Sequence, residues 1–401
     1  MSDDYAALDE KYAFPDEPRS FQHQDFDNLL IHATDLEASD ITWQTDEPVM
    51  AHIHGRNRRM TKRALNAHEV DNITKYIYGS NGVARIRGGE DIDCRHPIKT
   101  HGVGPNGTKI VRKLGFRVNI TGCTTHGDDN GIQITCRTIR SLPPKLSDLG
   151  IEEDLVKALF PDSGMVAICG ATGSGKSTLL AATIREILED EDAHQKIITL
   201  EAPIEFTYDE VTRSSTIVSQ HEIPRHLPTF ARGVRNTLRR APTIILVGET
   251  RDGETVNAAL EAAMTGHTLY TTMHCDSVAQ SLSRMANWFA PSERMTKIFE
   301  IIESLRVLVV QRLVKRVDGQ GRVALREYLV FDQTVRDQLR MVQTPKEAVH
   351  VVSKLVESRG QTMLSAAQRA FDAGLISAEL IASIEQASRS DLIEDLGLGV
   401  H

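Results

Sequence analysis

The stretch Gly170-Ala171-Thr172-Gly173-Ser174-Gly175-Lys176-Ser177 decides the fold of this 401-residue chain. It satisfies the spacing G-x-x-x-x-G-K-[ST], in which glycines let the backbone curl so that successive N–H groups point at a phosphate. We expect an apolar strand, Met165–Cys169, to enter the loop and a helix, Ser177–Glu189, to leave it. A Gly/Ser-rich surface turn is the alternative, and it would need neither flanking element. The pattern therefore predicts an α/β fold around a phosphate-binding loop (P-loop).

The residues of this loop predict a site for ATP and Mg²⁺, the two cofactors that the motif implies. Lys176 is expected to bring a mobile positive charge to the β- and γ-phosphates, and the Ser177 hydroxyl to ligate Mg²⁺. The predicted nucleotide-binding residues are Gly170, Ala171, Thr172, Gly173, Ser174, Gly175, Lys176, Ser177 and Thr178. Hydrolysis of the bound nucleotide would power a mechanical or transport step.

A second apolar strand, Thr243–Val247, is followed by a carboxylate at Glu249. This is the shape of a Walker B segment, in which the acid lies beside the γ-phosphate. Glu249 would there orient the attacking water or help to hold Mg²⁺ through water. The alternative is a solvated glutamate in a turn.

A third apolar strand, Lys196–Leu200, leads to Glu201 and Glu205, with a turn enforced by Pro203 between them. Ligands of open α/β sheets bind at the carboxyl edge of the strands, where both acids are expected. Either acid would tune Mg²⁺ or water there. A surface turn without a role in catalysis is the alternative.

Two histidines flank a fourth apolar strand, Thr268–Thr272. His274 follows the strand and would hydrogen-bond the γ-phosphate at the sheet edge and sense its loss. His267 precedes the strand, and a direct role for it is open. A single histidine is more often structural, so both residues have that alternative.

The remaining pattern predicts five parts. They are a mobile leader, an N-terminal domain of a helix and antiparallel strands, a linker stiffened by Pro143 and Pro144, an ATPase domain with a mostly parallel sheet, and a helical C-terminal region. The predicted boundaries are residues 1–20, 21–140, 141–147, 148–335 and 336–401. In the N-terminal domain we expect a helix at Phe26–Leu36 and strands at Ile41–Trp43, Val49–His54, Phe116–Ile120 and Ile132–Ile139. Glycine-rich turns are expected at Gly102–Gly107 and Gly122–Gly131.

Composition narrows the class of protein. The net charge of −9 disfavours bulk binding to nucleic acid, because an acidic surface repels phosphate backbones. The acidic N-terminus does not read as a signal peptide, and the longest apolar runs of about five residues are far below the ~20 needed to span a bilayer. With five cysteines and no C-x-x-C pair, the expectation is a cytoplasmic protein with reduced thiols.

Together these residues resemble the secretion-ATPase family of type II and type IV machines, and most of all its PilT-like branch. The matching motifs are the P-loop (Gly170–Thr178), the Asp box (Glu201–Glu205), Walker B (Gly248–Asp252) and the His box (Gly266–His274). Further matches are Ala38–Ile41 and Phe116–Asn119 of the family's N-terminal PAS-like domain, and Val310–Leu313. Pro224–Pro228 and Arg322–Asp332 are similar to ATPases of type IVB secretion and conjugation systems.

The chain departs from the family pattern at two places. Ala202 stands where many relatives have the aspartate that names the Asp box, which moves that role onto Glu201 and Glu205. The acidic residues common just before Walker B are missing from Ala241–Thr243. Neither departure touches Lys176 or Glu249, so hydrolysis is expected to survive.

The resemblance implies an α/β protein with an N-terminal PAS-like α+β domain and a C-terminal RecA-like ATPase domain. It also implies a homohexamer recruited peripherally to the inner membrane, at the cytoplasmic face of a secretion, pilus or conjugation complex, with a second ATPase as a further partner. Arg117 and Arg137 stand at the positions from which the family's N-terminal arginines reach ATP across a subunit boundary. Chemically, arginine suits phosphoryl oxygens, and a solvated strand arginine is the alternative.

Two other functions compete with this motor. A RecA-like nucleic-acid motor would carry a basic stripe, which the net charge argues against. A scaffold gated by nucleotide without useful turnover is argued against by the intact Glu249.

The P-loop spacing predicts that Lys176→Ala abolishes binding and turnover of ATP without unfolding the chain. The reason is that the ammonium supplies the mobile charge to the β- and γ-phosphates. Fluorescent-nucleotide titration and phosphate release measure the two losses, and circular dichroism checks the fold. Normal ATPase activity in this variant would overturn the P-loop interpretation.

Overall fold

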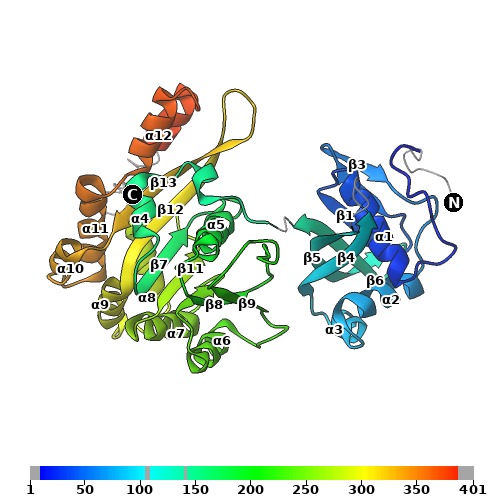
Figure 1. The fold of residues 1–401 in the computed structure, drawn as a ribbon, viewed down its shortest axis with the longest axis horizontal. Helices are drawn as coiled ribbons and strands as arrows, with labels where there is room; N and C mark the ends of the chain where they lie inside the picture. The colour runs from blue at the N-terminus through cyan, green and yellow to red at the C-terminus, as the bar shows by residue number, and fades with distance from the viewer. Residues whose placement is uncertain (1–9, 104–108, 140–141, 387–401) are drawn as a thin grey trace. The chain divides into compact units, whose positions relative to one another are not determined.

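The computed structural model describes residues 10–103, 109–139 and 142–386, and the chain divides into two compact units (Figure 1). The first unit holds Met1–Leu142 with Ala202–Glu210, and the second holds Pro143–Glu201 with Val211–His401. The chain thus first passes between the units inside the stretch expected as a linker. The short segment Ala202–Glu210, expected in the ATPase domain, groups with the first unit instead.

The described part of the first unit is a six-stranded sheet with three helices. The strand order is β3-β2-β1-β6-β5-β4, and every neighbouring pair is antiparallel. The strands are β1 (Asp40–Gln44), β2 (Met50–Ile53), β3 (Arg56–Arg59), β4 (Ile92–Val103), β5 (Lys109–Thr125) and β6 (Asp128–Ile139). The helices are α1 (His23–Asp35), α2 (Ala67–Tyr78) and α3 (Gly82–Arg87).

Alternating burial along the strands builds the core of this unit. In β1, Ile41 and Trp43 are buried while Asp40, Thr42 and Gln44 are half-exposed, as the period of two requires. The ring of Trp43 packs against Phe21 and Phe26. Residues 1–9 of the expected leader lie outside the described residues. Of its described part, Tyr12 and Phe14 are buried in this core, so that part packs on the unit.

The glycine-rich stretch before β6 is mostly strand, and the expected turn at Gly122–Gly131 is wrong in its extent. Strand β5 continues to Thr125 and β6 begins at Asp128. Gly131 serves close packing, because a β-carbon there would lie 2.7 Å from Thr125 Cγ2 and 2.8 Å from the Cys123 carbonyl oxygen. The other expected turn, Gly102–Gly107, lies largely outside the described residues.

The described part of the second unit is built on a seven-stranded sheet in the order β13-β12-β7-β11-β10-β8-β9. All neighbouring pairs are parallel except β12 with β13. The strands are β7 (Gly164–Cys169), β8 (Lys196–Glu201), β9 (Ile217–Glu222), β10 (Ile244–Val247), β11 (Thr268–Met273), β12 (Leu305–Lys315) and β13 (Arg322–Val330). Strands β7, β8, β10 and β11 lie where apolar runs predicted them.

Helices cover both faces of this sheet (Figure 1). One face packs on α5 (Lys176–Glu189), and the other on α6 (Phe230–Thr237), α7 (Gly253–Met264), α8 (Val278–Asn287) and α9 (Arg294–Ser304). The described part of the helical C-terminal region contains α10 (Gln333–Leu339), α11 (Pro345–Arg359) and α12 (Met363–Asp372), and residues 378–386 are also helical. The remaining short helices are α4 (Glu153–Ala158), η1 (Leu146–Leu149) and η2 (Leu238–Arg240).

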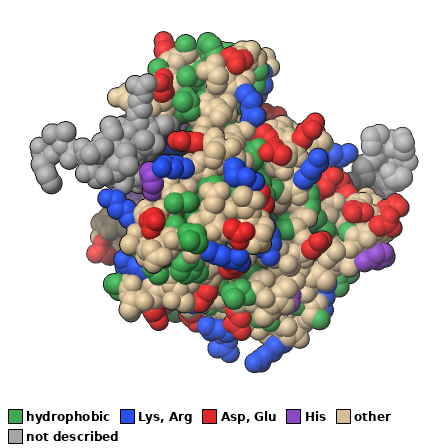
Figure 2. Space-filling model, turned by 90° about the vertical axis from the view of Figure 1, so that its left-hand side faces the viewer, with side chains coloured by type: hydrophobic (Ala, Val, Ile, Leu, Met, Phe, Trp, Pro, Cys, Tyr) green, Lys and Arg blue, Asp and Glu red, His purple; other side chains and the backbone are tan. Residues whose placement is uncertain are grey.

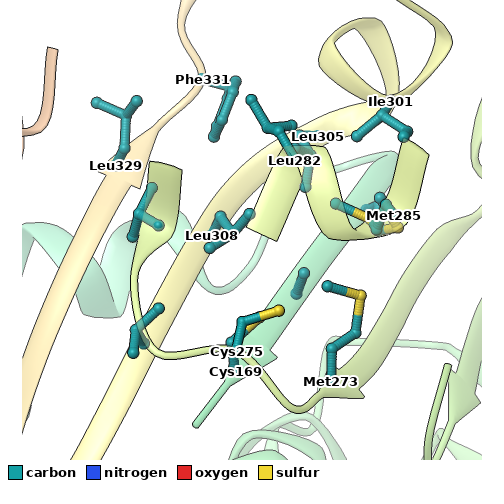
Figure 3. Close-up of a cluster of buried hydrophobic side chains, with 14 of the residues drawn as sticks. Cys169, Met273, Cys275, Leu282, Met285, Ile301, Leu305, Leu308, Leu329 and Phe331 are labelled. Atoms are coloured by element: carbon teal, nitrogen blue, oxygen red, sulfur yellow. The ribbon is translucent and has the colours of Figure 1, made fainter. Parts of the chain in front are cut away.

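One apolar core joins β7, β11, β12 and β13 to these helices. Cys169, Met273, Leu308 and Leu329 point from the strands toward Leu282 and other apolar side chains from the helices (Figure 3). Residues of β7 alternate between this core and the opposite face under α5, so the strand is buried throughout. That double burial explains why the strand reads as a continuous apolar run.

Gly131→Ala is expected to destabilise the first unit by about 1–3 kcal/mol, because the new methyl group overpacks a closed strand pair. Gly122→Ala is the matched control on β5, where the nearest atoms to a β-carbon lie 3.7 Å away. Urea unfolding followed by the fluorescence of Trp43, in a Trp288→Phe background, reports the first unit alone. Equal stability of the two variants would contradict the packing role of Gly131.

Candidate functional site

The P-loop lies between the end of β7 at Cys169 and the start of α5 at Lys176. Gly170, Gly173 and Gly175 have φ angles of 141°, 77° and 86°, a region that side chains rarely adopt. Two of these glycines also lie against β12. A β-carbon on Gly170 would lie 2.3 Å from the Gln311 carbonyl oxygen, and one on Gly175 would lie 2.9 Å from Gln311 Nε2. The glycines of the motif are thus required by backbone conformation and by close packing.

Lys176 folds back over the loop that it closes. Its Nζ donates to the carbonyl oxygens of Gly170 at 2.8 Å and Ala171 at 2.9 Å, and the residue is only 8% exposed. The ammonium therefore lies inside the loop, next to the N-terminus of α5. A phosphate held there would attract this charge more strongly than neutral carbonyls do, since charge-assisted hydrogen bonds are about twice as strong.

Three of the predicted catalytic side chains follow neighbouring strands at the carboxyl edge of the sheet. Glu201 ends β8, Glu249 follows β10 and His274 follows β11. Because the sheet order is β7-β11-β10-β8, these side chains lie at the same edge as the P-loop. Motifs that are far apart in the sequence thus lie in a row along one edge of the sheet, in the order P-loop, His274, Glu249 and Glu201.

Glu249 and His274 form a pair within this row. His274 Nε2 lies 3.4 Å from Glu249 Oε1, and Arg251 Nη1 lies 3.8 Å from the other carboxylate oxygen. Both Glu249 and His274 are half-exposed, so the pair can reach a ligand at the sheet edge. The arrangement can orient a water and report the position of an anion.

Threonines of β11 fix the backbone on either side of Glu249. Thr272 Oγ1 donates to the Gly248 carbonyl oxygen at 2.5 Å, and the backbone N–H of Thr250 donates to the carbonyl oxygen of Thr272 at 2.9 Å. The hydroxyls of Thr250 and Thr271 lie 2.5 Å apart. Glu249 is thereby held against the strand that carries His274.

Glu201 is held by its neighbours in the sheet. Its Oε1 accepts hydrogen bonds from Thr199 Oγ1 at 2.6 Å and from Gln220 Nε2 at 3.2 Å. These contacts fix the carboxylate at the carboxyl edge. The second histidine, His267, lies at the opposite edge, before β11, and contacts the Ala262 carbonyl oxygen through Nδ1 at 3.1 Å. The structural alternative therefore holds for His267.

Arg117, Arg137 and Glu205 belong to the first unit. Arg117 forms an ion pair with Asp93 at 2.6 Å and lies 3.9 Å from Glu205, while Arg137 forms one with Asp40 at 2.7 Å. Their action on a nucleotide in the second unit therefore stays a prediction.

Sequence reasoning missed a third arginine beside these two. In the sheet register Arg95 on β4 lies opposite Arg117 on β5, and Arg117 lies opposite Arg137 on β6. Directly opposed like charges destabilise a sheet, and here the carboxylates of Asp93 and Asp40 lie beside Arg117 and Arg137 and offset that repulsion. The alternation of side-chain direction along Asp93-Cys94-Arg95-His96 could have predicted this, because in a strand Arg95 faces away from buried Cys94.

The oxygen ligands at the carboxyl edge suit Mg²⁺. Ser177 is half-exposed in the first turn of α5, and Glu201 and Glu249 supply carboxylates at the same edge. Within the described ranges no three His, Cys, Asp or Glu side chains gather as a metal-binding group. This donor set suits a metal held largely by phosphates and water, which is the preference of Mg²⁺.

The comparison with known proteins identifies the family. A family model described as type II/IV secretion system protein matches residues 92–389. The chain belongs to this family. The twitching motility protein of Neisseria gonorrhoeae is 32% identical over 342 residues, covering 85% of each chain. The type IV pilus retraction ATPase PilT of Pseudomonas aeruginosa is 32% identical over 316 residues, covering 79% of this chain and 85% of PilT.

Solved structures agree with this assignment. The X-ray structure of the Legionella pneumophila ATPase DotB matches with a TM-score of 0.85 and 46% identity, over 93% of this chain and 98% of DotB. The pilus retraction motor PilT with bound ADP matches with a TM-score of 0.73 and 26% identity, over 88% and 94%. The chain is a PilT-like secretion ATPase related to DotB, and the predicted N-terminal domain plus RecA-like ATPase domain is confirmed as the fold class. In the described part of the chain, no helix has the length and apolar character needed to cross a membrane.

The pairing of Glu249 with His274 generates a prediction about the chemical step. Glu249→Gln keeps the shape of the side chain but removes its charge, so Mg-ATP should still bind while hydrolysis slows by about 100-fold or more. Nucleotide titration and phosphate release measure the two quantities.

Glu254→Gln is the matched control, because Glu254 is exposed on α7 and pairs with Arg235. This variant should keep wild-type turnover. If Glu249→Gln lost binding and turnover to the same extent, Glu249 would be a binding or structural residue.

Proposed function

We propose that this ATPase is the subunit of a homohexameric motor in a type IVB secretion or conjugation machine. Hydrolysis of Mg-ATP would move its two units about the linker at residues 141–147. The observation that carries the proposal is the row of P-loop, His274, Glu249 and Glu201 at one sheet edge. This row provides the parts that phosphoryl transfer to water requires.

The residues at this edge and Glu205 divide the proposed reaction among them. The P-loop N–H groups and Lys176 would bind the phosphates, and Ser177 would hold Mg²⁺, which would supply positive charge to neutralise them. Glu249 orients the water that attacks the γ-phosphorus, so that ATP and water give ADP and phosphate. His274 contacts the γ-phosphate and loses that contact on release. Glu201 and Glu205 tune Mg²⁺ or the attacking water.

The arginine row of Arg95, Arg117 and Arg137 supports completion of the site by a neighbouring subunit. Among the described contacts of Glu249 and His274, the arginine is Arg251, which lies 3.8 Å from Glu249. Arg251 lies near Glu249 Oε2, the carboxylate oxygen that is not paired with His274, and over the ring of Phe230. In a closed ring every interface is the same head-to-tail contact, so the first unit of one subunit can serve the P-loop of the next.

The proposed partners are proteins of a membrane complex. The similarity to DotB supports a secretion machine, and peripheral recruitment to the cytoplasmic face of the inner membrane fits that role. A second ATPase of the same machine is a further partner. On the face of the second unit that Figure 2 shows, Lys and Arg side chains are interspersed with Asp and Glu. With a net charge of −9, this mixed surface favours protein partners over nucleic acid.

A mixture of two inactive proteins tests completion of the site between subunits. Arg137→Ala and Lys176→Ala should each be inactive alone, since an arginine supplied to the transition state contributes ~10³ or more to phosphoryl transfer. In mixed rings some interfaces pair an intact P-loop with an intact Arg137 of the neighbour. Part of the ATPase activity should therefore return, as measured by phosphate release.

Arg87→Ala is the matched control, because Arg87 lies outside the arginine row and pairs with Asp71 on α2. It should be active alone. Co-purification of differently tagged subunits shows whether mixed rings form. If they form and remain inactive, Arg137 acts within its own subunit or has no catalytic role. Failure of the unaltered chain to form a ring would overturn the hexamer.

A further inference from the structure

Gln311 on β12 connects the P-loop to the interior of the second unit. Strand β12 pairs with β7 as far as Val310 opposite Cys169, so Gln311 is the next residue and lies beside the loop. Gln311 is 3% exposed. Its side-chain Nε2 donates to the Ser174 carbonyl oxygen at 2.7 Å, and its Oε1 accepts from Arg326 Nε at 2.9 Å. Both ends of the amide are thus engaged.

Arg326 on β13 fixes which way this amide points. Arginine has donors and no acceptor, so the oxygen of Gln311 must face Arg326 and the NH₂ group must face Ser174. Arg326 is itself 2% exposed and donates to the carbonyl oxygens of Leu149 at 2.9 Å and Gly150 at 3.0 Å. Burial lowers the pKa of Arg326, and the nearby Glu152 carboxylate opposes that shift. Its hydrogen bonds to Gln311, Leu149 and Gly150 therefore fix the position of the guanidinium.

The hydrogen bond to Ser174 also orients the next N–H group of the loop. In a planar trans peptide the C=O and the following N–H point in opposite directions. A Ser174 carbonyl held toward β12 therefore turns the Gly175 N–H away from β12. Gly175 is the residue directly before Lys176, where successive N–H groups of the motif face the phosphates. The orientation that phosphate binding needs is thus imposed from behind the loop.

We infer that Gln311 is a positioning residue of the nucleotide site, which holds the Ser174–Gly175 peptide ready for phosphate. The amide of Gln311 packs closely on the loop, because a β-carbon on Gly175 would lie 2.9 Å from Gln311 Nε2. Gln311 touches no phosphate itself and acts through the loop backbone. The inference rests on the proposed use of the P-loop and adds a residue that no motif of the loop contains.

Two variants at this position test the inference. Gln311→Glu keeps the length of the side chain and its contact with Arg326 but places an acceptor against the Ser174 carbonyl. Gln311→Leu removes both hydrogen bonds. Loss of a buried hydrogen bond in the loop is expected to raise the Kd for Mg-ADP by about tenfold in both variants. Because the loop binds substrate and transition state alike, KM for ATP should rise while kcat changes little.

Gln361→Ala is the matched control. Gln361 is also buried, and its Nε2 donates to the Arg326 carbonyl oxygen at 2.7 Å and to Glu152 Oε1 at 2.9 Å, away from the P-loop. This variant should lower the Tm and leave the Kd for Mg-ADP unchanged. Titration calorimetry with Mg-ADP and thermal unfolding of each full-length protein give the two readouts.

Each outcome distinguishes positioning from general stability. Weaker Mg-ADP binding in Gln311→Glu and Gln311→Leu, with unchanged binding in Gln361→Ala, supports the inference. An unchanged Kd in Gln311→Glu, or a Kd that follows Tm across all three variants, overturns it alone. Absence of Mg-ADP binding by the unaltered chain would overturn the proposed function and this inference with it.

Discussion

The close approach of the P-loop to β12 is the constraint on which the second unit depends. A β-carbon on Gly170 would lie 2.3 Å from the Gln311 carbonyl oxygen, so only glycine fits where β7 turns into the loop. This contact places the loop at the sheet edge where β10 and β11 also end. Glu249 and His274, which follow those strands, therefore lie at the same sheet edge as the loop. The packing of the P-loop against β12 thus sets the position of the loop relative to Glu249 and His274.

The same edge is reinforced from within the sheet. Threonines of β11 hold the backbone around Glu249, and Cys169 before the loop packs against Cys275 after His274 (Figure 3). These contacts join the ends of β7, β10 and β11 into one rigid rim. Rigidity of this kind matters because donors that are already aimed at developing charge need no reorganisation during the reaction.

The sequence predicted the elements whose cause is local. Buried parallel strands such as β7 and β11 read as apolar runs, and the P-loop spacing is itself a local pattern. Other features depend on contacts between distant residues. Gln311 meets Ser174 across 137 positions of the chain, and Arg95 joins the other arginines only through sheet register. The sequence predicted a turn at Gly131, because the contacts that require glycine there come from Cys123 and Thr125 on the opposite strand and cannot be seen in the local pattern.

The clamp that Arg326 places on the carbonyl oxygens of Leu149 and Gly150 has a mechanical consequence. These residues follow the prolines at which the chain enters the second unit. A pulling force on Leu149 and Gly150 is therefore transmitted through Arg326 to β13. Strand β13 is hydrogen-bonded along its length to β12, so the force does not simply detach the segment that contains Leu149 and Gly150. Hydrogen bonds loaded in parallel resist such shear far better than bonds that open one after another. The buried guanidinium of Arg326 thus connects the segment that enters the second unit to the sheet that carries the P-loop.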